Sequence, residues 1–341
     1  MVETRPSGPE RVLTRKNLSF QTLDDATSLV ITRGCLMEPT MQPPPFNSNN
    51  GEGLFMHRKL IPPLGFTSGY SFACFVVFAG TLMGFTLARA QFIDIDGVMC
   101  SPATAGGPLR HAAPGECFYF ISGAMHERFG IVLHLATVLP ASLLACFQLL
   151  PALRARFPAF HRANGYMVLL LSLLGVAGGL MITRNAFSGA LVTQTGFGLG
   201  AVAFLAALGM GWVSMRRMRV DQHRAWMLRA WFYVGAVVTT RILMSVGAQV
   251  VTVIGGYYMP EPCDKIESML GRDRTLSKYP TCKKFFDGEA LSQHALVVAN
   301  MAGEVDNISA ALDAAAGMAL WAAFVLHAAG VEIYVSPQLP T

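Results

Sequence analysis

Six apolar stretches separated by polar segments account for most of this chain. They cover about residues 65–88, 129–150, 166–183, 191–213, 225–254 and 308–329. A helix needs roughly 20 mainly apolar residues to cross the hydrocarbon core of a bilayer, and each stretch is close to that length or longer. The pattern therefore predicts an all-α fold, a polytopic transmembrane helix bundle with six spans.

The fifth stretch shows most clearly how such a helix is anchored. Residues 215–241 open with a cluster of arginines and continue without a break into apolar sequence, with aromatic residues between 226 and 233. Cations followed by aromatic side chains are typical of a cytoplasmic membrane boundary. Arg241 follows roughly 15–18 Å deeper at 1.5 Å per residue. An ionisable side chain at that depth is a candidate functional residue.

The arginines also predict the topology. The loops after the second and fourth spans carry three and four arginines, and a fifth follows just inside the fifth span, so the positive-inside rule assigns these loops, and both termini, to the cytoplasm. The loops at 89–127 and 257–306 then face the lumen or the exterior, where disulfides form. Four cysteines lie in these two loops and predict two disulfides, with three pairings open. They are Cys100, Cys117, Cys263 and Cys282.

The same pattern divides the chain into four parts. Residues 1–60 are rich in Pro, Ser, Asn and Thr without an apolar period, which predicts a disordered N-terminal tail. Residues 61–256 form a five-span membrane core, and 257–307 a lumenal or extracellular loop. Residues 308–341 supply the sixth span and a short C-terminal tail.

Composition agrees with a membrane protein. The chain is 52% hydrophobic and 14% charged, whereas soluble domains carry about a quarter charged residues. The net charge of +5 comes from arginines at helix ends, so we interpret it as a topology signal and expect no nucleic-acid partner. The expected partner is the lipid bilayer of an endomembrane or the plasma membrane.

Two His-Arg pairs mark the predicted cytoplasmic boundary. His161-Arg162 precedes the third span and His223-Arg224 precedes the fifth, with Arg229 one turn further on. Histidines at matching depth on parallel helices can ligate a haem iron, and nearby arginines can meet the propionates. This predicts one haem b, since the fourth span contains no histidine to complete a second site. The alternatives are that these residues are interfacial anchors, or that they form a metal or substrate site.

A second group of polar residues lies near or within the spans. The Arg241 guanidinium requires a hydrogen-bond acceptor, and the best one in the sequence is Asp313 in the sixth span. The two residues differ in depth by about 7 Å along the membrane normal, which an extended arginine can reach. That pair is either structural or a contact for a substrate or propionate. The full group is His134, Arg184, Arg241, Asp313 and His327.

Several of these segments carry a family resemblance. RFGIVLHLATVLPA (Arg128 to Ala141), FHRANGYMVLLLSLLGVAGGLM (Phe160 to Met181) and VDQHRAWMLRAWFYVGAVVTTR (Val220 to Arg241) resemble the fungal branch of the predicted membrane proteins of domain of unknown function 2306. The resemblance covers about residues 65–255 and implies an integral membrane bundle, without supplying a reaction. The resemblance also implies that six residues are positions of the family motif: His161, Arg162, His223, Arg224, Arg229 and Arg241.

Two functions remain open on this basis. Spans two to five are similar to the transmembrane b-type cytochromes that move electrons from ascorbate, which favours a haem-b oxidoreductase using His161 and His223 and an electron donor. The missing histidine in span four departs from that two-haem pattern. The alternative is a non-redox small-molecule carrier, or a membrane enzyme acting on a lipophilic metabolite near Arg241, Asp313 and His134. The sequence does not decide whether the protein is an enzyme.

Overall fold

The computed structural model describes residues 64–66, 68–101 and 112–335, except for the side chain of Ser188. The tail predicted for residues 1–60 lies outside the described residues, as does the end of the C-terminal tail at 336–341.

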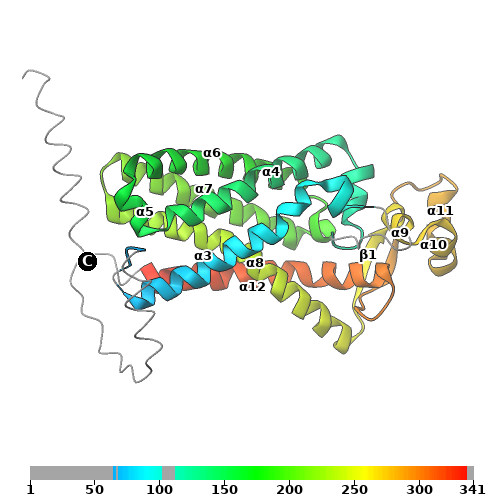
Figure 1. Cartoon of the computed structure of the whole chain (residues 1–341). Coiled ribbons are helices and arrows are strands. Elements are labelled where there is room, and N and C mark those ends of the chain that lie inside the picture. The colour runs from blue at the N-terminus through cyan, green and yellow to red at the C-terminus, as the bar shows by residue number, and fades with distance from the viewer. Residues whose placement is uncertain (1–63, 67, 102–111, 336–341) are drawn as a thin grey trace, which may run out of the picture. The chain divides into compact units, whose positions relative to one another are not determined.

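In the described part of the chain, six helices are long and apolar enough to cross a membrane (Figure 1). This confirms the predicted all-α bundle of six spans. The helices are α3 (Gly69–Arg89, extended by the 3-10 turn η1, Ala90–Ile93), α4 (Met125–Gln148), α6 (Pro158–Ile182), α7 (Leu191–Arg216), α8 (Val220–Ile254) and α12 (Val305–Val335).

Four helices begin earlier than the apolar pattern predicts, and the difference is five residues or more for α6 and α8. Helix α6 starts at Pro158, where the fixed φ of proline suits the first turn and its missing N–H costs nothing. Helix α8 starts at Val220. His161 and His223 therefore lie inside the first turns of these helices rather than in the preceding loops. The short helix α5 (Pro151–Arg156) occupies the loop between α4 and α6.

Small residues set the closest helix contacts. A Cβ on Gly178 of α6 would lie 2.6 Å from the backbone nitrogen of His134 in α4. In the same way, a Cβ on Gly196 of α7 would lie 2.7 Å from the side chain of Leu320 in α12. Small residues allow membrane helices to approach at this distance. Helix packing in this bundle thus depends on glycines at the α4–α6 and α7–α12 interfaces.

The two polar loops lie at the same end of the bundle, as predicted. Each contains one disulfide, Cys100–Cys117 in the first and Cys263–Cys282 in the second, which resolves the three pairings left open by the sequence. The first loop includes the π-helical turns η2 (Ile95–Met99) and η3 (Phe118–Ser122). The hydroxyl of Ser309, in the second turn of α12, donates a hydrogen bond of 2.9 Å to the carbonyl of Pro114 and joins the first loop to α12, just after the second loop.

The second loop is folded, which the sequence did not predict. We call residues 257–304 the cap. A two-stranded antiparallel sheet forms its base, with Tyr258 opposite Val298 and Pro262 opposite His294. The cap elements are β1 (Tyr258–Pro262), α9 (Cys263–Leu270), α10 (Arg272–Lys278), η5 (Pro280–Cys282), α11 (Lys283–Phe286) and β2 (His294–Val298).

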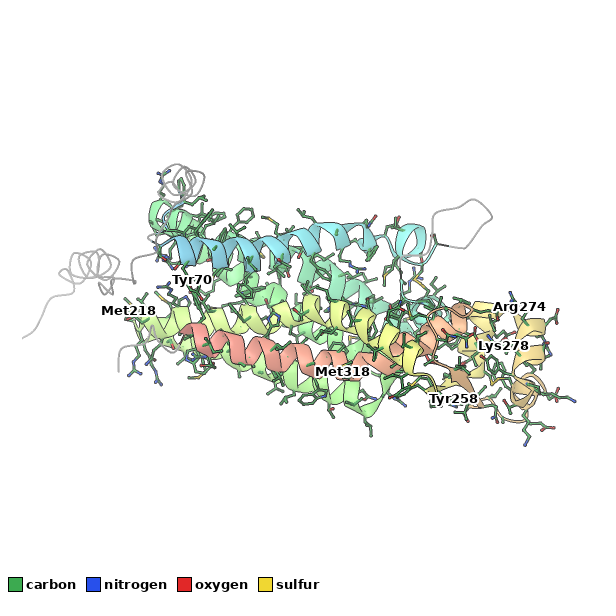
Figure 2. All side chains as sticks on the ribbon, turned by 90° about the horizontal axis from the view of Figure 1, so that it is seen from below. Tyr70, Met218, Tyr258, Arg274, Lys278 and Met318 are labelled. Carbon is green, nitrogen blue, oxygen red and sulfur yellow. A yellow bond between two sulfur atoms is a disulfide. The ribbon has the colours of Figure 1, made fainter. Side chains whose placement is uncertain are left out.

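The cap and the arginine-rich loops lie at opposite ends of the bundle. Figure 2 shows Tyr258, Arg274 and Lys278 at one end and Tyr70 and Met218 at the other. This arrangement is the one expected if the arginine-rich end is cytoplasmic and the disulfides are on the other side. The cytoplasmic location of the termini stays a prediction.

Candidate functional site

A buried ion triad lies where the cap meets the bundle. The Lys265 ammonium, on α9, donates hydrogen bonds of 2.7 Å to Glu261 Oε2 on β1 and 2.9 Å to Asp313 Oδ2 on α12. The three side chains are 4%, 3% and 9% exposed, respectively. Charges buried to this extent require partners. The triad therefore fixes α9 and β1 of the cap against α12.

The local fold explains how two of these residues meet. Cys263 lies between Glu261 and Lys265, and its disulfide to Cys282 ties the junction of β1 and α9. On β1 the side chains alternate between the two faces, and Glu261 points to the buried face. Lys265, four residues later in the first turn of α9, returns to the same carboxylate.

Glu261 is only half satisfied. Its Oε2 binds Lys265, but its buried Oε1 has no hydrogen-bond partner among the described residues. Burial raises the pKa of Glu261 to about 7, with Lys265 opposing the shift and Asp313 adding to it. Burial alone would lower the pKa of Lys265, but Asp313 and Glu261 outweigh it and raise that pKa above its ordinary value. The triad thus combines a permanent cation with a carboxyl that titrates near neutral pH.

The first loop adds a third carboxyl and a phenol. Gly115, at φ +82°, lies so close to Lys265 that a Cβ there would be 2.4 Å from its Cε. Burial raises the pKa of the neighbouring Glu116, Arg241 opposes this shift, and Asp313 adds to it. Burial also raises the pKa of Tyr119 to about 12, while Lys265 lowers it. We call Glu116, Tyr119, Arg241, Glu261, Lys265 and Asp313 the charge cluster.

Arg241 does not pair with Asp313, so that prediction from the sequence is wrong. Lys265 is the partner of Asp313. A search for partners among the residues of the spans does not include Lys265, because it lies in the cap. The Arg241 guanidinium lies 4.4 Å from the ring centroid of Phe187, in the 3-10 turn η4 (Ala186–Gly189). Phe187 adopts φ +48°, a conformation unusual for a bulky side chain, and such strain clusters at functional sites.

The five polar residues predicted near or within the spans do not form one group. His134 Nδ1 lies 2.7 Å from the Gly175 carbonyl oxygen between α4 and α6, and Arg184 donates to the Gly189 carbonyl. His327 bonds to Thr239 at 2.8 Å. It follows Asp313 by 14 residues on one helix, which separates the two by about 21 Å. Arg241 and Asp313 belong to the charge cluster, and His327 belongs to the other half of the membrane.

The histidines predicted to bind haem lie at the opposite end of the bundle from the cap. His223 Nδ1 is 2.9 Å from the carbonyl oxygen of Gly211 in α7, which makes Nδ1 the protonated nitrogen and leaves Nε2 as the possible ligand atom. His161 is half-buried at the start of α6. Among the described residues, no hydrogen bond joins the two imidazoles, and no three His, Cys, Asp or Glu side chains form a metal site. Haem ligation by this pair stays a prediction.

The arginines around these histidines differ in their environments. Arg162 and Arg224 are exposed, as expected of interfacial anchors. Arg229 forms a bidentate ion pair with Glu332 of α12, at 2.6 and 2.8 Å, and its guanidinium lies 4.7 Å from the Trp226 ring. Arg229 therefore has a structural partner that the sequence analysis did not identify.

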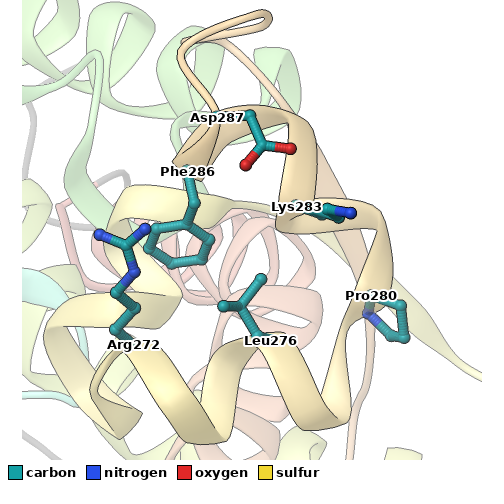
Figure 3. Close-up of a pocket in the computed structure, with 6 residues that line it drawn as sticks. All are labelled: Arg272, Leu276, Pro280, Lys283, Phe286 and Asp287. Carbon is teal, nitrogen blue, oxygen red and sulfur yellow. The ribbon is translucent and has the colours of Figure 1, made fainter.

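A pocket of about 300 Å³ lies on the cap, away from the charge cluster (Figure 3). Arg272 lies 4.8 Å from the ring centroid of Phe286, and the other charged side chains of the lining, Lys283 and Asp287, are exposed. Charges open to solvent lack the enclosed, water-poor surroundings in which electrostatic interactions are strong. The charge cluster is the stronger candidate site.

Sequence reasoning missed Glu116, Glu261 and Lys265 because all three lie in polar loops. One pattern could have identified them. Glu116 precedes Cys117, and Glu261 and Lys265 each lie two residues from Cys263. Charged residues beside disulfide cysteines, in two loops predicted to meet, are candidates for a shared site.

Comparisons with known proteins support the assignment as a membrane protein. Residues 131–258 match the family described as "Predicted membrane protein (DUF2306)", which confirms the resemblance seen in the sequence. A relative from Aspergillus versicolor, "Ava biosynthesis cluster protein G", is 26% identical over 314 residues, covering 80% of this chain and 90% of that protein. No solved structure matches.

Proposed function

For a six-span membrane protein with a DUF2306 region, we propose that the charge cluster binds a small lipophilic metabolite and acts on it by acid–base catalysis. One observation carries this proposal: Glu261 is buried, Lys265 holds one of its oxygens, and the other has no partner among the described residues. An unpaired buried carboxyl oxygen is costly for a structure. A bound substrate would supply the missing hydrogen bond.

The surroundings of Glu261 suit a general acid or base. A catalytic carboxyl works best when its pKa is near the operating pH, and burial raises the pKa of Glu261 to about 7. Lys265 holds the side chain in place through Oε2. Protonated Glu261 also hydrogen-bonds to Asp313, which adds to the rise in its pKa, and a substrate that takes the place of this contact could receive the proton of Glu261 or give one to it. This is the role for which perturbed carboxyls are arranged in active sites.

Arg241 and Phe187 offer the other half of a binding site. A guanidinium within a span can bind an anionic or carbonyl oxygen, and intramembrane cations generally mark such functional positions. The aromatic ring 4.4 Å from Arg241 adds an apolar surface. Together with Glu261 they favour a substrate that is mainly apolar and carries an oxygen or nitrogen function.

The similarity to a biosynthesis cluster protein supports this class of function. That relative is described only as belonging to a biosynthesis cluster. By analogy, we propose that the present chain serves one step in making a small molecule, and that the substrate reaches it from the bilayer.

The test is a comparison of metabolites in the source organism. Disruption of the gene should remove one lipophilic product and accumulate its precursor. Complementation with the wild type should restore the product, and Glu261→Gln should not. Glu304→Gln is the matched control, because Glu304 is a more exposed carboxylate of the same cap. Full restoration by Glu261→Gln at normal protein level would remove the proposal.

A haem-b oxidoreductase is the second candidate, favoured by one contact. Haem ligands commonly donate their other ring N–H to a carbonyl, and His223 does so to Gly211. His161 and His223 would hold the iron, Arg162 and Arg224 would meet the propionates, and the haem would supply one-electron transfer. The absorption spectrum of the purified protein tests this. A reducible Soret band lost in His161→Ala and His223→Ala supports it, and a colourless, fully folded protein rejects it.

A further inference from the structure

The sheet of the cap has one buried and one exposed face. Along β2 the side chains of Ala295 and Val297 are buried against the bundle, whereas Leu296 and Val298 are 67% and 42% exposed. Opposite them on β1, Pro260 pairs with Leu296 and Tyr258 pairs with Val298. Apart from His294 at one end, the exposed face of this sheet is therefore apolar, and a two-stranded sheet in contact with water usually shows polar residues there.

This apolar face continues an exposed apolar surface of α8. The exposed residues Val246, Val250, Val253 and Ile254 follow the i, i+4, i+7, i+8 spacing of one helix face. Val253 is 86% exposed, at the end of the helix. Helix α8 leads directly into β1 (Figure 1).

Two polar contacts fix the sheet to the helices on either side of it. The Thr252 hydroxyl near the end of α8 accepts a hydrogen bond from the backbone N–H of Met301, just after β2. Asn307 of α12 donates to the carbonyl of Val298. The sheet therefore has a defined position relative to α8 and α12, and its exposed face extends the apolar surface of α8.

The depth of the sheet can be estimated from the helices beneath it. Its buried face packs in one core with Ala248 of α8 and Ala311 of α12. Arg229 and Glu332, whose ion pair marks the other membrane boundary, are 19 and 21 residues away along the same helices. At 1.5 Å per residue these separations are about 28 and 32 Å, close to the thickness of the hydrocarbon core. The sheet lies at the outer edge of that core.

We propose that the exposed face of the β1–β2 sheet, together with the end of α8, binds lipid in the interfacial layer of the bilayer. Tyr257 and Tyr258 provide the aromatic rings typical of this layer. The cap helices α10 and α11 differ, because Arg272, Lys283 and Lys284 are exposed there. The cap therefore rests on the membrane with its sheet and presents α10 and α11 to water.

This contact does not depend on the chemistry of the charge cluster, but it bears on access to it. Glu261 lies on β1 between Pro260 and Pro262 and points to the opposite face. A single strand then separates the lipid from the charge cluster. Lipid on the outer face would hold that strand, and with it Glu261, in place.

The contact is tested by photocrosslinking of the full chain in phosphatidylcholine vesicles that contain a diazirine-bearing phosphatidylcholine. Adducts are located by mass spectrometry. We expect adducts on residues 253–260 and 294–298 at levels similar to those on the exposed faces of the spans, and several-fold fewer on 272–287. Leu296→Asp should reduce the adducts on 294–298 several-fold and leave those on the spans unchanged.

Three results would overturn the proposal. The first is labelling of the sheet no stronger than that of 272–287 in the wild type, a result that needs no variant to fold. The second is unchanged labelling of 294–298 in a folded Leu296→Asp variant. The third is a crosslink between two copies when photo-leucine, a diazirine-bearing residue, replaces Leu296 in ordinary phosphatidylcholine vesicles, which would assign the face to a second copy of this chain.

Discussion

Replacing Lys265 by methionine removes the cation from the buried ion triad and leaves two carboxyls without it. The ammonium makes hydrogen bonds of 2.7 and 2.9 Å to Glu261 and Asp313, and all three side chains are less than a tenth exposed. Removing one partner of a buried ion pair typically costs about 3–5 kcal/mol, because the remaining charge has no compensation. We expect Lys265→Met to lower the free energy of unfolding by that amount at pH 7.5.

The matched control is Arg128→Met. Arg128 also forms one ion pair in this half of the protein, with Asp96, but the two side chains are 47% and 62% exposed. Exposed pairs contribute about 0–1 kcal/mol because water screens them. The assay is chemical unfolding of the purified protein in detergent micelles, followed by circular dichroism.

The pH dependence of the stability of Lys265→Met provides a second, independent test of the buried triad. Without Lys265 the folded-state pKa of Glu261 rises further above its unfolded value, so the folded protein holds a proton that the unfolded chain releases. The stability of the variant is then greatest at low pH and is lost as pH rises through the folded-state pKa. Equal stability of Lys265→Met and Arg128→Met at pH 7.5, or no recovery of Lys265→Met at pH 5, would refute a buried triad.

Three further predictions concern Glu261, the disulfide of the cap and the closest helix contact. Glu261→Gln should flatten the pH dependence of stability between pH 4.5 and 7, where the wild type loses at most about 3 kcal/mol as pH rises toward the raised pKa of Glu261; unfolding at several pH values measures this. Reducing the Cys263–Cys282 disulfide should cost about 3 kcal/mol for a loop of this length, visible as a lower melting temperature under dithiothreitol in a variant lacking the other disulfide. Gly178→Ala should destabilise the protein by about 1–3 kcal/mol because its Cβ would meet the backbone of α4. Gly198→Ala, with open space around it, should show no such loss.

The membrane architecture could be predicted from the sequence because its physical cause is local. A span needs a long apolar run and a charged boundary, and both are visible at residues 215–241 without knowledge of any contact. The meeting of the two disulfide loops followed from the same topology. The start of α6 was predicted too late because the sequence before Tyr166 is basic, although Pro158 provides a good first turn.

The site was harder to predict because it depends on contacts between distant segments. The pairing of Arg241 with Asp313 was a reasonable inference from depth alone, since both lie inside spans. It failed because Lys265 reaches Asp313 from a cap helix 48 residues away in sequence. That helix has only eight residues, too few for its amphipathic pattern to indicate what it packs against. The fold of the cap is determined by a disulfide and a sheet whose pairing a single sequence does not reveal.

The central claim is that both disulfide loops lie on one face of the membrane, where they build the charge cluster. Thiol labelling in sealed vesicles of known orientation tests it directly. Free cysteines are first blocked with a permeant maleimide. An impermeant reductant and an impermeant maleimide then follow, with denaturant outside the sealed vesicles to open the loops, because Cys100, Cys263 and Cys282 are buried in the folded protein. We predict that the thiols of Cys100–Cys117 and Cys263–Cys282 are labelled together in one vesicle orientation and are both protected in the other. Labelling of the two disulfides in opposite orientations would contradict the claim.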